Sequence, residues 1–94
     1  MDPRNRRDRD SHGYVFRPTG PLPGFPEAVR VRPKVGGSGR ARARWQLPNG
    51  VFLEWDYQHG TVEAYNHRGE HLGEFDPDDG RQLKRPNPKR RADP

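Results

Sequence analysis

Residues 51–65 alternate between the two sides of an extended chain, and this pattern constrains the fold more than any other feature of the sequence. One side is apolar and the other carries carboxylates: Val51, Leu53, Trp55 and Tyr57 against Phe52, Glu54 and Asp56. A period of two is that of a β-strand. The alternation stops at His59-Gly60 and resumes over 61–65. Because Gly tolerates positive φ, this dipeptide predicts a tight turn and the whole stretch a β-hairpin.

A two-residue turn at His59-Gly60 fixes the register of that hairpin. The facing pairs that it predicts are Tyr57 with Val62, Asp56 with Glu63, and Trp55 with Ala64. Asp56 and Glu63 would lie side by side, with Cβ atoms about 5 Å apart. Two carboxylates at that separation repel, which raises the pKa of one of them or attracts a cation, and such pairs suit proton transfer. A solvated sheet face with incidental acids is the alternative interpretation.

Composition restricts the class of protein. With 94 residues, of which 28% are hydrophobic, the chain suits one small domain with a modest core. It has no cysteine, which excludes a disulfide framework, a thiolate metal site and a cysteine nucleophile. We expect no membrane span, because no apolar run approaches the roughly 20 residues that a helix needs to cross a bilayer. The charged N-terminus lacks the apolar segment of a signal peptide.

The formal charge of +5 is divided into blocks of opposite sign. Residues 1–53 carry eleven Arg or Lys and four acids, residues 54–80 one Arg and eight acids, and residues 81–94 six Arg or Lys and one acid. A polyanion would be attracted to the basic flanks and could bring its backbone to the carboxylates between them. The pattern favours a nucleic-acid partner over a merely solubilising surface.

Short strands separated by turns predict an antiparallel meander. The candidates are residues 28–32, 40–47, 51–57, 61–65, 71–75 and 81–84. We expect a mainly β fold, in which a small, highly twisted antiparallel sheet covers about 28–85. An irregular or short-helical arm at 12–27, packing Tyr14 and Phe16 on the sheet, precedes it, and a basic tail at 86–94 follows. Residues 1–11 are expected to be a flexible linker or domain boundary, and 35–40 a flexible loop.

Arg40, Arg42 and Arg44 alternate with alanines, which would put three guanidinium groups on one face of a strand. Such a stripe suits successive phosphates. Asn49-Gly50 predicts a tight hairpin to the next strand, so the stripe and the carboxylates would be neighbours in one sheet. Trp45 and Trp55 follow apolar alternation and are expected in the core.

These groups meet the requirements of RNA cleavage by internal transesterification. A base takes the proton of a 2′-hydroxyl, which attacks its own phosphorus, an acid protonates the departing 5′-oxygen, and a cation stabilises the phosphorane. Carboxylate, imidazole and guanidinium fill these roles, and the substrate supplies the nucleophile. His59, His71 and Glu63 show no recognisable metal-ligand spacing, so we expect no metal and no cofactor.

At these residues the sequence resembles the cytotoxic domain of the ribosome-inactivating colicins and their relatives. The resemblance is dense over 54–90, whereas upstream only His12-Gly13-Tyr14, the Gly-rich loop and the basic strand ending in Trp45 look similar. The matching residues of the dense part are Glu54-Trp55-Asp56, Gln58-His59-Gly60, Glu63, Tyr65, Gly69, His71-Leu72-Gly73, Phe75-Asp76-Pro77, Gly80, Gln82-Leu83-Lys84, Pro86 and Pro88-Lys89-Arg90.

The resemblance implies that residues 12–94 form a toxin endoribonuclease domain that cuts 16S rRNA at the ribosomal decoding site. It places Asp56, His59, Glu63 and Arg90 at the family's catalytic positions. Glu63 would be the general base, His59 the general acid, Asp56 the group that orients His59, and Arg90 the group that holds the phosphate. The first two roles could be exchanged, because coupled groups share their titration. Further substrate contacts are expected from Tyr14, Arg40, Arg42, Arg44, Tyr65, His71, Lys84, Lys89 and Arg91.

The resemblance also implies partners. They are the small ribosomal subunit, an acidic cognate immunity protein, and upstream translocation and receptor-binding domains. The parent toxin would be secreted by the producing bacterium and act in the cytoplasm of the target bacterium. Two other functions fit the residues: a non-catalytic module that binds RNA or an immunity protein, and a ribonuclease with another target, such as tRNA.

Overall fold

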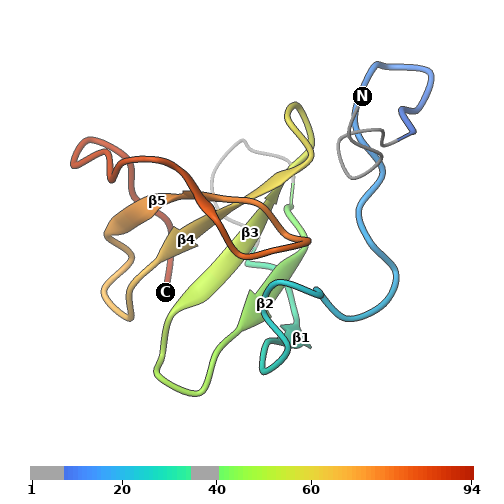
Figure 1. Cartoon of the computed structure of the whole chain (residues 1–94). Coiled ribbons are helices and arrows are strands. Elements are labelled where there is room, and N and C mark those ends of the chain that lie inside the picture. The colour runs from blue at the N-terminus through green and yellow to red at the C-terminus, as the bar shows by residue number, and fades with distance from the viewer. Residues whose placement is uncertain (1–7, 35–40) are drawn as a thin grey trace.

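The computed structural model describes residues 8–34 and 41–94. Its strands form one antiparallel sheet of six, ordered as they occur in the chain (Figure 1). They are β1 (Val29–Val31), β2 (Arg44–Gln46), β3 (Phe52–Asp56), β4 (Thr61–Tyr65), β5 (His71–Phe75) and β6 (Gln82–Lys84). The described ranges contain no helix, and so none that could cross a membrane. The predicted mainly β meander is confirmed, while the flexible loop expected at 35–40 lies outside the described residues.

The core lies on the apolar face of β2, β3 and β4. Trp45 and Trp55 are almost fully buried there and meet edge to face, with ring centroids 6.4 Å apart. Leu53, Val62 and Ala64 complete this face. The prediction that both tryptophans belong to the core is therefore confirmed, since the alternation of β3 directs Trp55 and Leu53 to the same side.

The N-terminal arm is irregular and runs beside the sheet on the side opposite the C-terminal tail (Figure 1). Val15 and Leu22 of the arm pack into the core. The Val15 backbone N–H donates to the Tyr57 carbonyl at 2.6 Å. The Trp55 Nε1–H donates to the Val15 carbonyl at 3.1 Å. Phe16 is 58% exposed, so the expectation that it packs on the sheet is wrong. An extended segment alternates its side chains, and Val15 takes the inner position.

The hairpin of β3 and β4 has a longer loop than the sequence predicts. Asp56 faces Thr61 and Trp55 faces Val62, so the predicted facing pairs are wrong and residues 57–60 form the loop. Asp56 explains the difference, because its carbonyl accepts the Gly60 N–H at 2.8 Å and its carboxylate accepts two further loop N–H groups. The register is displaced by two residues. Every side chain therefore keeps its predicted face, which a displacement of one would have reversed.

The predicted arginine stripe is only partly present. β2 begins at Arg44, whose guanidinium is buried against the Phe52 ring, 4.1 Å from its centroid, and bonded to Glu54. Arg44 is thus part of the sheet and does not offer an open phosphate contact. Arg40 lies outside the described residues. The turn predicted at Asn49-Gly50 is confirmed, with Gly50 at a φ of 89° between β2 and β3.

Candidate active site

Five charged side chains form a row across the polar face of the sheet, one from each of β2 to β6. Each faces the next across a strand pair: Arg44, Glu54, Glu63, Glu74 and Lys84. At one end Arg44 Nη2 lies 2.7 Å from Glu54 Oε2. At the other, Lys84 Nζ lies 3.8 Å from Glu74 Oε1 and the lysine is 61% exposed. This charged row therefore holds three acids between one strong and one weak counter-charge.

Asp56, at the end of β3, builds the loop that carries His59. Its Oδ1 accepts the backbone N–H groups of Gln58 and His59, and its Oδ2 lies 2.8 Å from His59 Nδ1. Burial raises the pKa of Asp56, but these hydrogen bonds outweigh it and hold that pKa below its ordinary value. The imidazole is thus fixed through one nitrogen. With 49% of its side chain exposed, His59 can offer Nε2 to a bound molecule.

Glu63 lies beneath the surface, with His71 as its partner. His71 Nε2 is 2.7 Å from Glu63 Oε1, and the Asn87 backbone N–H donates to His71 Nδ1 at 2.9 Å. Because a backbone N–H can only donate, Nδ1 is unprotonated and Nε2 carries the hydrogen that Glu63 accepts. Burial, and then the positive charge of Arg90, lower the pKa of His71 and keep its ring neutral. His71 therefore supports Glu63 instead of bordering the open surface.

The pKa of Glu63 lies above its ordinary value. Burial is the largest cause, and the nearby charge of Asp56 adds to it. A hydrogen bond from Glu74 and the positive charge of Arg90 act in the opposite direction without cancelling it. A carboxyl with a raised pKa is suited to take up a proton, so Glu63 has the electrostatic character of a general base.

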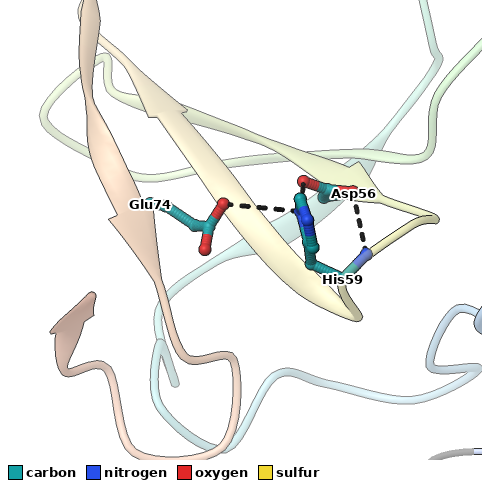
Figure 2. A group of neighbouring side chains, drawn as sticks. All are labelled: Asp56, His59 and Glu74. Carbon is teal, nitrogen blue, oxygen red and sulfur yellow. Dashed lines mark hydrogen bonds and ion pairs between the residues drawn. The ribbon is translucent and has the colours of Figure 1, made fainter. Parts of the chain in front are cut away.

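Glu74 is the site residue that the sequence analysis did not single out. Figure 2 shows His59 between the carboxylates of Asp56 and Glu74, with Glu74 Oε1 3.8 Å from His59 Nδ1. One ligand atom from each of the three residues lies within 4.8 Å of the others. The hydrogen bond between Asp56 and His59 accounts for the closeness of those two residues, and Glu74 is brought near them from β5. His71 and Glu74 share the polar face only because a β-bulge interrupts β5 between them, and no sequence pattern indicated it.

Arg90 is placed by the C-terminal tail, which is tied to the turn before β5. The backbones of Glu70 and Arg91 form an isolated antiparallel β-bridge, and the Ala92 N–H donates to the Gly69 carbonyl at 3.1 Å. Arg90 Nε donates to the Tyr65 hydroxyl at 2.9 Å. Burial lowers the pKa of Arg90, but this hydrogen bond and the negative charges of Glu63 and Asp56 outweigh burial. The pKa of Arg90 is therefore raised, and the guanidinium stays charged.

Two hollows meet at this site. A cleft of about 420 Å³, the His59 cleft, is lined by Tyr14, Arg42, Asp56, Tyr57, Gln58, His59 and Arg90. A groove of about 530 Å³, the basic groove, contains the cationic residues Lys34, Arg42, Arg44, Arg68, Arg90 and Arg91. Arg42 and Arg90 line both hollows. A chain of phosphates can therefore lie along the basic groove with one of them beside His59.

The structure brings together most of the residues that the sequence analysis selected. Asp56, His59, Tyr14, Arg42 and Arg90 line the His59 cleft, and Tyr65 and Arg91 line the basic groove. Glu63 and His71 lie buried on the same face of the sheet. Lys84 and Lys89 are exposed, Arg44 is buried, and Arg40 falls outside the described ranges.

A family model described as Cytotoxic matches residues 15–93. The chain belongs to this Cytotoxic family. The domain is 41% identical over 93 residues to colicin-E6 and 43% identical over 93 residues to cloacin, both of Escherichia coli, with 90% of this chain covered in each. It is 49% identical over 70 residues to colicin E3 of Escherichia coli, with 72% of this chain covered.

This Cytotoxic domain is much shorter than those relatives. The aligned part makes up 17% of colicin-E6, 16% of cloacin and 12% of colicin E3. The chain therefore spans less than a fifth of the length of each of these proteins.

Proposed function

We propose that this Cytotoxic domain is a toxin endoribonuclease that cleaves 16S rRNA at the ribosomal decoding site by metal-independent transesterification. The observation that carries the proposal is the hydrogen-bonded Asp56–His59 pair in a cleft that Arg42 and Arg90 also line. Membership of the Cytotoxic family supports it. The 16S target rests on the resemblance of residues 54–90 to the ribosome-inactivating colicins.

In the proposed reaction Glu63 takes the proton of a 2′-hydroxyl, and the oxygen attacks the adjacent phosphorus. The bond from phosphorus to the 5′-oxygen breaks, and His59 gives its Nε2 proton to that oxygen. The products are a 2′,3′-cyclic phosphate and a 5′-hydroxyl end. Arg90 neutralises charge on the phosphorane, and Asp56 keeps the imidazole oriented. Each proton transfer contributes roughly 10²–10⁴-fold to the rate, and none of these steps needs a metal ion.

Burial favours a second assignment of the proton transfers. Only 3% of the Glu63 side chain is exposed, against 49% of the His59 side chain. A 2′-hydroxyl can reach Glu63 only if RNA binding uncovers it. In the second assignment His59 carries out both transfers, and Glu63 holds His71 and Arg90 in place.

The wider biology is part of the same proposal. A domain that cleaves ribosomal RNA would kill its producer, so we expect a cognate immunity protein. Its surface should be acidic, because the basic groove is lined by five cationic residues besides the buried Arg44. We further expect upstream translocation and receptor-binding domains in a secreted parent toxin, and action in the cytoplasm of the target bacterium.

The test is to incubate bacterial ribosomes with the purified chain and to sequence the new RNA ends. We expect one discrete 3′ fragment of 16S rRNA, with a cyclic phosphate on the partner fragment. His59→Ala should abolish its release while ribosome binding persists. His67→Ala is the matched control, since His67 is exposed in a turn outside the His59 cleft, and it should cleave normally.

The outcomes separate the alternatives. Complete loss of cleavage in Glu63→Gln supports Glu63 as the base, whereas partial loss supports the assignment of both transfers to His59. Ends that map to tRNA would replace the target while keeping the chemistry. Full cleavage by His59→Ala would remove the mechanism, and binding without any cleavage by the native chain would leave a module that only binds RNA or an immunity protein.

A further inference from the structure

We propose that Glu63 and Glu74 form a carboxyl pair that shares one proton, and that Glu74 is a positioning residue for Glu63. The two carboxyls face each other across β4 and β5. The catalytic consequence rests on the proposed function, whereas the shared proton follows from the geometry of the sheet alone.

Both members of the pair are buried. Glu63 is 2% exposed and Glu74 is 5% exposed. Side chains directly opposite in an antiparallel sheet have Cβ atoms about 4.5–5.5 Å apart. Two ionised carboxylates at that separation, shielded from water, repel strongly unless cations compensate both of them.

The neighbouring elements do not supply two cations to this pair. On one side, Arg44 of β2 is committed to Glu54 of β3 at 2.7 Å. On the other, Lys84 of β6 lies 3.8 Å from Glu74 and is 61% exposed, so water screens its charge. Asp56 of β3 adds a further negative charge.

The histidines and the tail do not supply the two positive charges that a doubly ionised pair of Glu63 and Glu74 would need. His71, at the start of β5, is neutral, and His59 Nδ1 lies 2.8 Å from Asp56 but 3.8 Å from Glu74. Arg90 of the tail supplies a positive charge that acts on Glu63, and the same charge also serves Asp56. One compensating charge for two carboxyls leaves a deficit, and a proton held between them removes it.

The surroundings decide which carboxyl keeps the proton. Glu63 accepts the Nε2–H of His71 at 2.7 Å and feels the positive charge of Arg90, and both favour its ionised form. The cationic partners of Glu74 in the described residues are weaker: the exposed Lys84 at 3.8 Å, and His59, also at 3.8 Å, which is committed to Asp56 at 2.8 Å. Burial, followed by the hydrogen bond and charge of Glu63, raises the pKa of Glu74. Glu74 therefore holds the proton and donates it to Glu63.

This division has a consequence for catalysis. With a protonated neighbour, Glu63 keeps its negative charge and a fixed orientation while Asp56 and His59 occupy the adjacent positions. Loss of the shared proton creates two adjacent buried anions, so the state of the pair ties the behaviour of Glu63 to pH. Glu74 acts through Glu63 and needs no contact with RNA.

The test is a titration of the glutamate side-chain carboxyls by ¹³C NMR on the isotope-labelled chain. In the native chain we expect Glu63 and Glu74 to titrate as a coupled pair, with two steps seen at both residues and the upper step above the range of ordinary glutamates. Glu74→Gln preserves the shape and a hydrogen-bond donor but removes the shared proton, so Glu63 should titrate in one step. Glu74→Asp should restore two steps. Glu27→Gln, which removes an exposed carboxyl of the arm, should leave both steps unchanged.

Cleavage kinetics give a second readout. The ratio of the Glu74→Gln rate to the native rate should change with pH, whereas a purely structural role would give a constant ratio. Independent single-step titrations of Glu63 and Glu74 in the native chain would overturn the inference even if no variant folds. If the native chain cleaves RNA but the two glutamates titrate independently, the proposed function stands and the shared proton is refuted. If the two glutamates titrate as a coupled pair but the native chain does not cleave RNA, the shared proton stands and the proposed function is refuted.

Discussion

Asp56 shows how one side chain can serve both folding and chemistry. Its carboxylate accepts two backbone N–H groups of the loop and also the ring of the histidine that this loop carries. The same bonds hold its pKa low, so the group remains ionised where a general acid would work. A residue with several partners of this kind is fixed in direction, which explains why His59 is oriented although half of it faces water.

His71 provides a prediction about pH and stability. Burial, and then Arg90, lower its pKa below the ordinary value of 6.5. At a pH between the lowered pKa of the folded chain and the ordinary pKa of the unfolded chain, the unfolded chain binds a proton that the folded chain does not. The free energy of unfolding therefore falls as the pH falls through this window. We therefore expect the difference in unfolding free energy between the native chain and His71→Gln to be largest above pH 6.5 and to shrink on acidification.

Urea unfolding at several pH values between about 5 and 8 measures this difference. Histidine is the side chain whose ordinary pKa falls in this range. The raised pKa values of Glu63 and Glu74 act with the opposite sign, since stability is lost as the pH rises through their titration. Both glutamates remain in the variant, and His71→Gln keeps an N–H donor for Glu63, so the comparison reduces their contribution. His67→Gln, in an exposed turn, is the matched control, and an equal pH dependence in both variants would contradict the account of His71.

At the scale of the strand, the alternation of side chains predicts the strand bounds and faces, but it does not predict the β-bulge in β5. β4 and β5 were predicted with their observed bounds, and the polar face of β3 was predicted with its acids. In a regular strand His71 and Glu74, three positions apart, would point to opposite faces. The bulge at Leu72 and Gly73 puts both on the polar face. Such a bulge depends on contacts with two neighbouring strands, and a single strand sequence does not encode those contacts.

The hairpin loop and the arginine stripe illustrate the same limit. A turn rule considers only His59-Gly60, whereas the observed loop is set by the side chain of Asp56, which competes for backbone donors. The alternation of Arg42 and Arg44 gave their spacing but not the ion pair that buries Arg44 against Glu54. The identities of the site residues were thus accessible from sequence, whereas their partners and their burial depended on tertiary packing.

The docking of the tail leads to a prediction for Gly69. Gly69 has a φ of 83°, and a Cβ atom added there would collide with the Ala92 carbonyl oxygen. Gly69→Ala should therefore incur a backbone strain of about 1–2 kcal/mol and displace the tail that carries Arg90. We expect a lower unfolding temperature together with a large loss of cleavage, measured by thermal denaturation and by release of the 16S fragment.

Gly50→Ala is the matched control for this substitution. Gly50 has a similar φ of 89°, but a Cβ atom there would meet only the His67 Cβ, at an ordinary 3.5 Å. It should lose similar stability through backbone strain while retaining cleavage. If both variants cleave equally well, the contact between Gly69 and the tail does not position Arg90.

For the whole molecule, the fold converts blocks of charge in the sequence into one surface. The acids of β3, β4 and β5 come together on the sheet, while arginines from the strand region, the turn before β5 and the tail line the basic groove beside them. Arg42 and Arg90 join the two regions. An RNA backbone held by the groove would be delivered to acids that it would otherwise avoid.

This arrangement predicts a specific salt dependence of RNA binding. Each phosphate contact releases counterions, so removing one should reduce the slope of log K against log salt by about 0.7 for a single-stranded RNA. We expect this reduction for Arg42→Gln and for Arg68→Gln, measured by fluorescence anisotropy with a single-stranded RNA in the non-cleaving His59→Ala background. Arg17→Gln removes an exposed arginine of the arm that lines neither hollow and should leave the slope unchanged. Equal slopes in all three variants would mean that the RNA backbone does not follow the basic groove, and the proposed path to His59 would have to be replaced.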